Sequence, residues 1–274
     1  MVKKLFKHEF RSWLRIMPII YIIIVAMASM HRLLQCFEAH NVYYDITFFS
    51  ATFTFVLAAY AALCTPAVVS VVRFYKNMFT SEGYLTMTLP VTPANHLWVK
   101  SITTICFGFL TSAVMVLSLV IITAGDLFTE IWKAAAYLIR SFCENIPRDI
   151  LIHCVFYILE LGVLLLVSAF YNCLLYYLCL CIGQLFRKAR ILASIGAFFA
   201  YGMIVDAIST CFSLGFTMLD LAGVLENIWK AIDRIGVENA AHIFFVLAIL
   251  GSCVTGLVFF LLCHTILRKK LNLE

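Results

Sequence analysis

The sequence has few charged residues. Asp, Glu, Lys and Arg make up 13% of its 274 residues and hydrophobic residues make up 64%, whereas soluble domains hold roughly 25% charged and 45–50% apolar residues. The mean hydropathy of +0.99 agrees. So few charges cannot cover the surface of a soluble domain. The composition therefore predicts that lipid surrounds most of the chain, in spans of about 20 apolar residues each.

Motifs for nucleotide, metal or nucleophile chemistry are also missing. The sequence holds no G-x-x-x-x-G-K-S/T phosphate loop, no H-E-x-x-H zinc motif, no G-x-S-x-G turn and no ladder of arginines. Its 11 cysteines include no C-x-x-C pair and lie mostly in apolar runs, where they act as small apolar side chains. Cys36 and Cys143 fall outside these runs and could pair. No metal site and no catalytic residue is predicted.

Six apolar runs are long enough to cross a bilayer. Backbone groups in hydrocarbon must satisfy their own hydrogen bonds, and no short segments alternate as barrel strands do, so the runs are predicted to be helices. The fourth run exceeds a ~30 Å core, so it should project from the bilayer or bend near Gly162. The predicted spans, in one all-α transmembrane domain over residues 1–274, are Ile16–Leu34, Ile46–Val72, Ser101–Ala124, Ile150–Ile182, Ile191–Leu219 and Ala240–Leu267.

The positive charges indicate an orientation. If the spans alternate, 14 of the 20 Lys and Arg residues fall on the side of the N-terminus, and most acids fall on the other side. Short loops rich in Lys and Arg stay in the cytoplasm. The chain is therefore predicted to lie in the cell membrane with both termini cytoplasmic. Its net charge of +5 needs no nucleic acid to explain it.

The start of the chain has a second interpretation. Lys3–Arg15 would be the basic region of a signal peptide, Ile16–Val25 its apolar region, and Ala26–Ala28 its cleavage site. Cleavage would leave five spans. The long basic region and the apolar residues that continue to Leu34 favour an uncleaved first span.

Three segments outside the spans are amphipathic. Residues 1–15 place Phe6, Phe10 and Trp13 on one helical face and basic residues on the other, which predicts an interfacial helix. Residues 125–149 and 219–239 show similar apolar stripes and are predicted as amphipathic or re-entrant helices on the outer side.

The longest polar cytoplasmic segment covers residues 73–100. It is too rich in aromatic residues for a flexible linker and too short for a domain, and Pro90 and Pro93 fix the chain's return to the membrane. Such an elbow either docks onto a cytoplasmic partner or simply packs as a loop. The residues alone leave both interpretations open.

Two acids, Glu160 and Asp206, lie within the fourth and fifth runs. A charge inside a bilayer is costly, so such groups usually face protein or water. They mark either a polar translocation path, or a proton-linked site, or only interhelical hydrogen bonds. Asp206 lacks the Gly-x-Gly-Asp context of an intramembrane aspartyl protease.

Three short motifs stand between Arg73 and Pro93: Phe-Tyr-Lys-Asn at 74–77, Glu-Gly-Tyr-Leu at 82–85 and Thr-Leu-Pro-Val at 88–91. With them, this segment resembles the first cytoplasmic loop of bacterial type-2 ATP-binding-cassette (ABC) exporter permeases, most of all the small permeases of clostridial-type Gram-positive bacteria. The basic interfacial helix, the six spans and the basic C-terminal residues are compatible with the same family.

This resemblance implies a permease subunit that is not itself an enzyme. ATP and Mg²⁺ would bind a separate cytoplasmic ABC ATPase subunit, and a second permease subunit, identical or not, would complete the transporter. The loop after the second span would form a coupling helix that docks on the ATPase. The docking candidates are Tyr75, Asn77, Phe79, Glu82, Gly83, Tyr84, Leu85 and Leu89.

Two other functions stay open. The chain could be the membrane solute-binding subunit of an importer, which requires a polar pocket, or an integral membrane enzyme that uses Glu160 or Asp206. Neither has a motif in the sequence, and the transported substrate is not encoded in any pattern.

Overall fold

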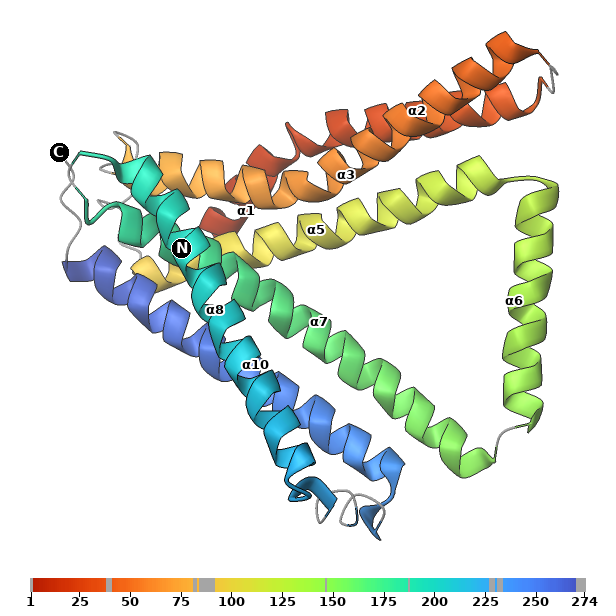
Figure 1. Cartoon of the computed structure of the whole chain (residues 1–274). Coiled ribbons are helices and arrows are strands. Elements are labelled where there is room, and N and C mark those ends of the chain that lie inside the picture. The colour runs from red at the N-terminus through yellow and green to blue at the C-terminus, as the bar shows by residue number, and fades with distance from the viewer. Residues whose placement is uncertain are drawn as a thin grey trace. The chain divides into compact units, whose positions relative to one another are not determined.

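The computed structural model describes residues 2–37, 41–80, 83, 92–145, 147–186, 188–226, 230 and 234–269. Over these ranges the chain forms α-helices joined by short turns and contains no strand (Figure 1). The predicted all-α class is confirmed.

Six helices are long and apolar enough to cross a membrane, which confirms the predicted polytopic membrane fold. Five of them have 31–38 residues, more than the ~20 that a bilayer core requires, so their ends extend past the hydrocarbon, whereas the first has 19 residues and about matches the core. A shorter helix, α1 (Val2–Trp13), precedes the first of them. The six are α2 (Met17–Gln35), α3 (Val42–Phe79), α5 (Pro93–Thr123), α7 (Arg148–Gly183), α8 (Arg190–Leu221) and α10 (Val237–Lys269).

The predicted cytoplasmic segment is more helical than its composition suggested. Helix α3 continues without a break to Phe79, and α5 already begins at Pro93. No helix-breaking residue stands between Val72 and Phe79, and proline is favoured at the first position of a helix. Both helices therefore enter the predicted segment 73–100 and shorten the connection between them.

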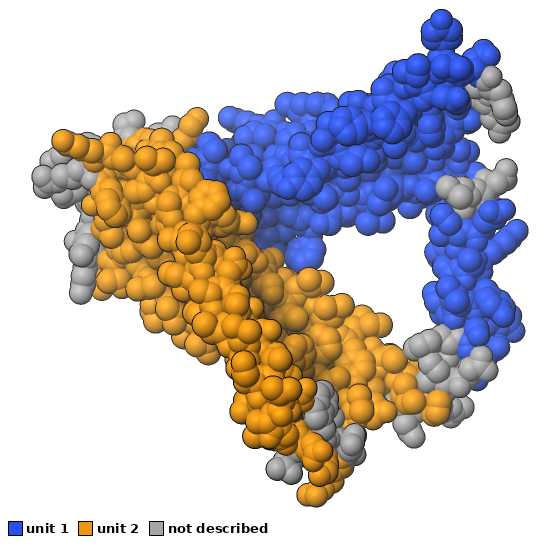
Figure 2. Space-filling view, in the orientation of Figure 1, with its two compact units in different colours: residues 1–74, 89–146 blue, residues 75–88, 147–274 orange. Residues whose placement is uncertain are grey.

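The chain divides into two compact units, residues 1–74 with 89–146 and residues 75–88 with 147–274 (Figure 2). In the first unit, α1 and α2 both pack against α5. Ile24 and Ala28 of α2 join Phe55 of α3 and Met115 of α5 in one apolar cluster. A second cluster, formed by Trp13, Met17 and Phe107, fixes the junction between α1 and α2.

The predicted amphipathic segment 125–149 contains helix α6 (Asp126–Asn145). Gly125 precedes it with a φ of 114°, a conformation that glycine adopts without strain. A Cβ at Gly125 would also lie 2.3 Å from the Arg32 guanidinium. In the other predicted segment, 219–239, the structure describes residues 219–226, 230 and 234–239.

In the second unit, α10 and α8 both pack against α7. Helices α7 and α10 run parallel, because His242 contacts Glu160 near the start of both helices and Cys263 contacts Leu174 further along both. Buried cysteines, among them Cys173, Cys181 and Cys263, fill this interface as free thiols, as predicted. Cys36 is also a free thiol, and the side chain of its suggested partner Cys143 lies outside the described residues.

Gly183, the last residue of α7, allows the start of α8 to approach closely. A Cβ there would lie 1.8 Å from Ser194 Oγ and 2.6 Å from the Arg190 carbonyl oxygen. We expect Gly183→Ala to cost about 1–3 kcal/mol of unfolding free energy, because the start of α8 must move away. Gly162→Ala, in open space on α7, is the matched control and should not destabilise. Equal unfolding midpoints of both variants in mixed micelles would contradict this close approach.

Candidate functional site

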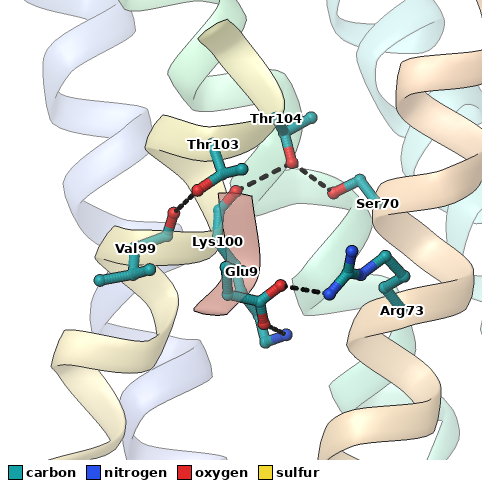
Figure 3. A network of polar contacts seen from close by, with 7 residues as sticks. All are labelled: Glu9, Ser70, Arg73, Val99, Lys100, Thr103 and Thr104. Carbon is teal, nitrogen blue, oxygen red and sulfur yellow. Dashed lines mark hydrogen bonds and ion pairs between the residues drawn. The ribbon is translucent and has the colours of Figure 1, made fainter. Parts of the chain in front are cut away.

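A buried cluster of charges joins three helices of the first unit. Glu9 of α1 accepts a hydrogen bond from Arg73 Nη2 of α3 at 2.6 Å and is also bonded to Lys100 Nζ of α5 (Figure 3). The side chains of Glu9, Lys100 and Arg73 are 5%, 6% and 13% exposed. The carboxylate thus links the N-terminal helix to two membrane helices.

Neutral polar groups extend the cluster along α3 and α5. Thr104 Oγ1 lies 2.9 Å from the Lys100 carbonyl oxygen and 2.8 Å from Ser70 Oγ. Because one hydroxyl has a single proton, Thr104 donates to one of these oxygens and accepts from Ser70 when it donates to the carbonyl. Thr103 Oγ1 donates to the Val99 carbonyl oxygen at 2.7 Å. These contacts hold Lys100 and its backbone in place.

Aromatic rings pack beside the cluster, next to Arg73. The Arg73 guanidinium lies 6.0 Å from the Trp13 ring centroid, at the outer limit of a cation–π contact. Trp13 in turn stacks on Phe107 with centroids 5.0 Å apart. A charged group and a packed aromatic pair therefore fix α1 together.

The electrostatics of the cluster favour ionised Glu9. Burial by itself raises the pKa of Glu9, but Lys100 and Arg73 outweigh it and hold the pKa below the usual 4.5. Its ion pairs therefore stabilise the fold above that pH and are lost as the pH falls through the lower, folded-state pKa. One carboxylate faces two cations, and buried Arg73 Nη1 has no hydrogen-bond partner within the described part of the chain.

Sequence reasoning missed Glu9. It assigned the basic residues of α1 to one face and the aromatic residues to the other, without placing this acid. The signal was present, because Glu9 follows Phe6 by three residues and precedes Trp13 by four, which puts it on the apolar face. An acid there needs a buried cation as partner.

Four of the eight predicted docking residues lie in the described residues. The Tyr75 and Phe79 rings lie 6.1 Å apart at the end of α3, with Phe79 buried and Tyr75 and Asn77 half-buried. The Gly83 amide donates to the Thr80 carbonyl oxygen at 2.7 Å. A Cβ on Gly83 would lie 2.6 Å from the Met78 carbonyl oxygen, so this turn requires glycine. Glu82, Tyr84, Leu85 and Leu89 lie outside the described residues.

Glu160 belongs to a hydrogen-bonded chain with two histidines that the sequence did not single out. His242 Nδ1 lies 2.8 and 2.9 Å from the two Glu160 oxygens, and His242 Nε2 lies 2.9 Å from His153 Nδ1. The Tyr157 ring covers the His242 ring at 4.4 Å between centroids, and its hydroxyl donates to the Glu238 carbonyl oxygen. This Glu–His–His chain can hold or pass a proton between α7 and α10.

Asp206 lies outside the Glu–His–His hydrogen-bonded chain. It lies on α8, where Thr210 donates to its backbone carbonyl oxygen and no described side chain pairs with its carboxylate. Its carboxylate is exposed and lines a groove between α7 and α8. The two predicted intramembrane acids thus belong to two separate polar sites, one satisfied by histidines and one open.

The fold and these sites define a multi-pass α-helical membrane protein with a buried charge cluster and two polar sites within its spans. No protein-family model, no curated protein and no solved structure matches the chain. Within the described residues, no group of three His, Cys, Asp or Glu side chains is arranged to hold a metal ion.

Proposed function

We propose that the chain is the transmembrane permease subunit of an ABC exporter. The observation that carries the proposal is the Glu9–Arg73–Lys100 cluster, which joins α1, α3 and α5 directly beside the segment that resembles a coupling loop. Arg73 and Phe79 belong to one unbroken helix, about 9 Å apart along its axis at 1.5 Å per residue. A push on the end of α3 would therefore act on the same helix that carries Arg73.

The proposed mechanism is a rigid-body switch driven from the cytoplasm. A separate ABC ATPase subunit would bind ATP and Mg²⁺ and close, and it would press on the docking residues from Tyr75 to Leu89. Aromatic side chains suit this contact, because they bury a large area with little freedom to yield. The spans would then move between an inward-facing and an outward-facing packing.

The remaining parts of the proposal follow from the same family. A second permease subunit would pair with this chain in the cell membrane, with both termini in the cytoplasm. ATP hydrolysis would occur on the partner, so the chain itself would have no catalytic residue.

The test is copurification from the native membrane, with ATP hydrolysis measured on the eluate. We expect a soluble P-loop ATPase with the unaltered chain, and less of it with Glu82→Lys and Gly83→Ala. The first substitution reverses a charge on the docking surface, and the second displaces the turn from Met78. Glu144→Lys, on the exposed surface of α6, is the control and should retain the ATPase.

Two results would contradict the proposal. Recovery of the chain without an ATPase under several mild detergents would favour a solute-binding subunit or a membrane enzyme. Unchanged complex formation and transport with Glu82→Lys would remove Glu82 from the docking site.

A further inference from the structure

A groove of about 310 Å³ lies between α7 and α8, within the second unit. Its size falls in the range of small-molecule sites, which run from roughly 300 to 1,000 Å³. Aromatic rings dominate the lining, with one carboxylate, one amide and no Lys or Arg. The lining residues are Asn172, Leu175, Tyr176, Phe198, Phe199, Tyr201, Gly202, Met203 and Asp206.

Helical spacing on α8 shapes this groove. Phe198, Gly202 and Asp206 are four residues apart, so they lie along one face of the helix. A Cβ on Gly202 would have no atom within 4 Å, so glycine leaves open space between the aromatic ring and the carboxylate. Across the groove, the Tyr176 ring lies 5.9 Å from the Phe198 ring.

The polar groups of the groove carry negative charge and no positive charge. The Asn172 amide nitrogen donates to the Ser168 carbonyl oxygen at 2.8 Å, and its side-chain oxygen has no hydrogen-bond partner among the described residues. Tyr201 is engaged through its hydroxyl with the Tyr171 hydroxyl. Asp206 contributes the one charge, and no described cation pairs with it. The electrostatic potential in the groove is therefore negative.

The position of Asp206 along the membrane span limits which ligands can reach its carboxylate. Asp206 is the seventeenth of 32 residues in α8, so it lies near the middle of the span, roughly 24 Å from the start of the helix at 1.5 Å per residue. A lipid head group stays at the bilayer surface and does not reach this depth. An ionised carboxylate here needs a cation that brings its own apolar body into the membrane.

We propose that this groove binds a lipophilic organic cation, with its charge near Asp206 and its apolar body among the rings of Tyr176, Phe198 and Phe199. Ring faces attract cations that have lost their water, which adds to the attraction of the carboxylate. If the chain is an exporter subunit, this cation belongs to the class of exported substrates, and that part of the inference rests on the proposed function.

Tetraphenylphosphonium is the probe, because its charge does not depend on pH and it cannot donate a hydrogen bond. Binding to the purified full chain in detergent is followed with a tetraphenylphosphonium-selective electrode. We expect saturable binding, at least 10-fold weaker in Asp206→Asn, which loses the charge, and in Gly202→Leu, which keeps the charge and fills the groove. Gly215→Leu, in equally open space on the same helix, should bind as the unaltered chain does.

Neutral triphenylphosphine oxide, of similar shape, should compete only weakly. Equal binding by the unaltered chain, Asp206→Asn and Gly202→Leu would overturn the proposal, as would equal competition by the neutral compound or no saturable binding at all. Unchanged elution on size exclusion would show that the variants are folded. A shift of Asp206→Asn from dimer to monomer, without saturable cation binding, would assign the carboxylate to a second copy of the chain instead.

The outcome is separable from that of the permease proposal. Cation binding by a chain that recovers no ATPase would keep the groove as a binding site and overturn the exporter. An ATPase that copurifies with a chain unable to bind the cation would do the reverse.

Discussion

Glu9→Gln should lower the unfolding free energy of the chain by about 3–5 kcal/mol, the usual cost of removing one partner from a buried ion pair. The substitution keeps the size of the side chain and removes only its charge. Arg73 and Lys100 would then repel each other at buried positions with no carboxylate between them. Denaturation in mixed micelles, followed by far-ultraviolet circular dichroism, measures the loss.

The matched control is Glu144→Gln. Glu144 pairs with Arg140 in a geometry similar to that of Glu9 and Arg73, 2.8 Å apart, but the two side chains are 61% and 80% exposed. Exposed pairs contribute roughly 0–1 kcal/mol. Equal effects of the two substitutions would show that burial of the Glu9 cluster does not matter.

A double variant separates the interaction from general damage. With Lys100→Met already in place, Glu9→Gln should cost about 1–3 kcal/mol less than it does alone, because one buried cation has gone. Additive losses would mean that Glu9 and Lys100 do not interact.

His242→Ala should have the second large effect, about 2–3 kcal/mol, because it leaves polar groups on α7 that are partly buried without their hydrogen-bond partner. Removing the imidazole leaves both Glu160 and His153 without the partner seen here. The same denaturation assay applies. His264→Ala, on the same helix and outside this chain of hydrogen bonds, is the control and should cost less.

The Glu160→Gln background tests the origin of this effect. There, His242→Ala should cost clearly less than in the unaltered chain, since no carboxylate remains to be stranded. If His242→Ala costs the same in both backgrounds, the loss comes from packing against Tyr157 and not from Glu160.

The membrane fold could be predicted from the sequence because hydrocarbon permits few backbone structures. Each run of some 20 apolar residues, such as Ser101–Ala124, had to be a helix, and the structure confirms six candidates. The ends of the helices were less predictable. Residues 73–79 and 93–100 mix charged, polar and aromatic side chains, yet they continue α3 and begin α5, because a helix that extends beyond its apolar run is not limited by hydropathy.

The polar sites were only partly predictable. Glu160 and Asp206 stood out because charge is rare within apolar runs. His153 and His242 did not, since a neutral imidazole is tolerated in a span and its partner sits 82 or more residues away in the sequence. Glu9 was hidden by neighbouring basic residues, and only the fold shows that its face of α1 is buried.

The Glu9–Lys100 contact also has a consequence for biogenesis. The two residues are 91 positions apart, and proteins are synthesised at about 5–20 residues per second. Lys100 is therefore synthesised roughly 5–20 s after Glu9, and only then can α1 form this contact. Until the third span enters the membrane, the N-terminal helix cannot take its final place, so the first three spans mature as one insertion unit.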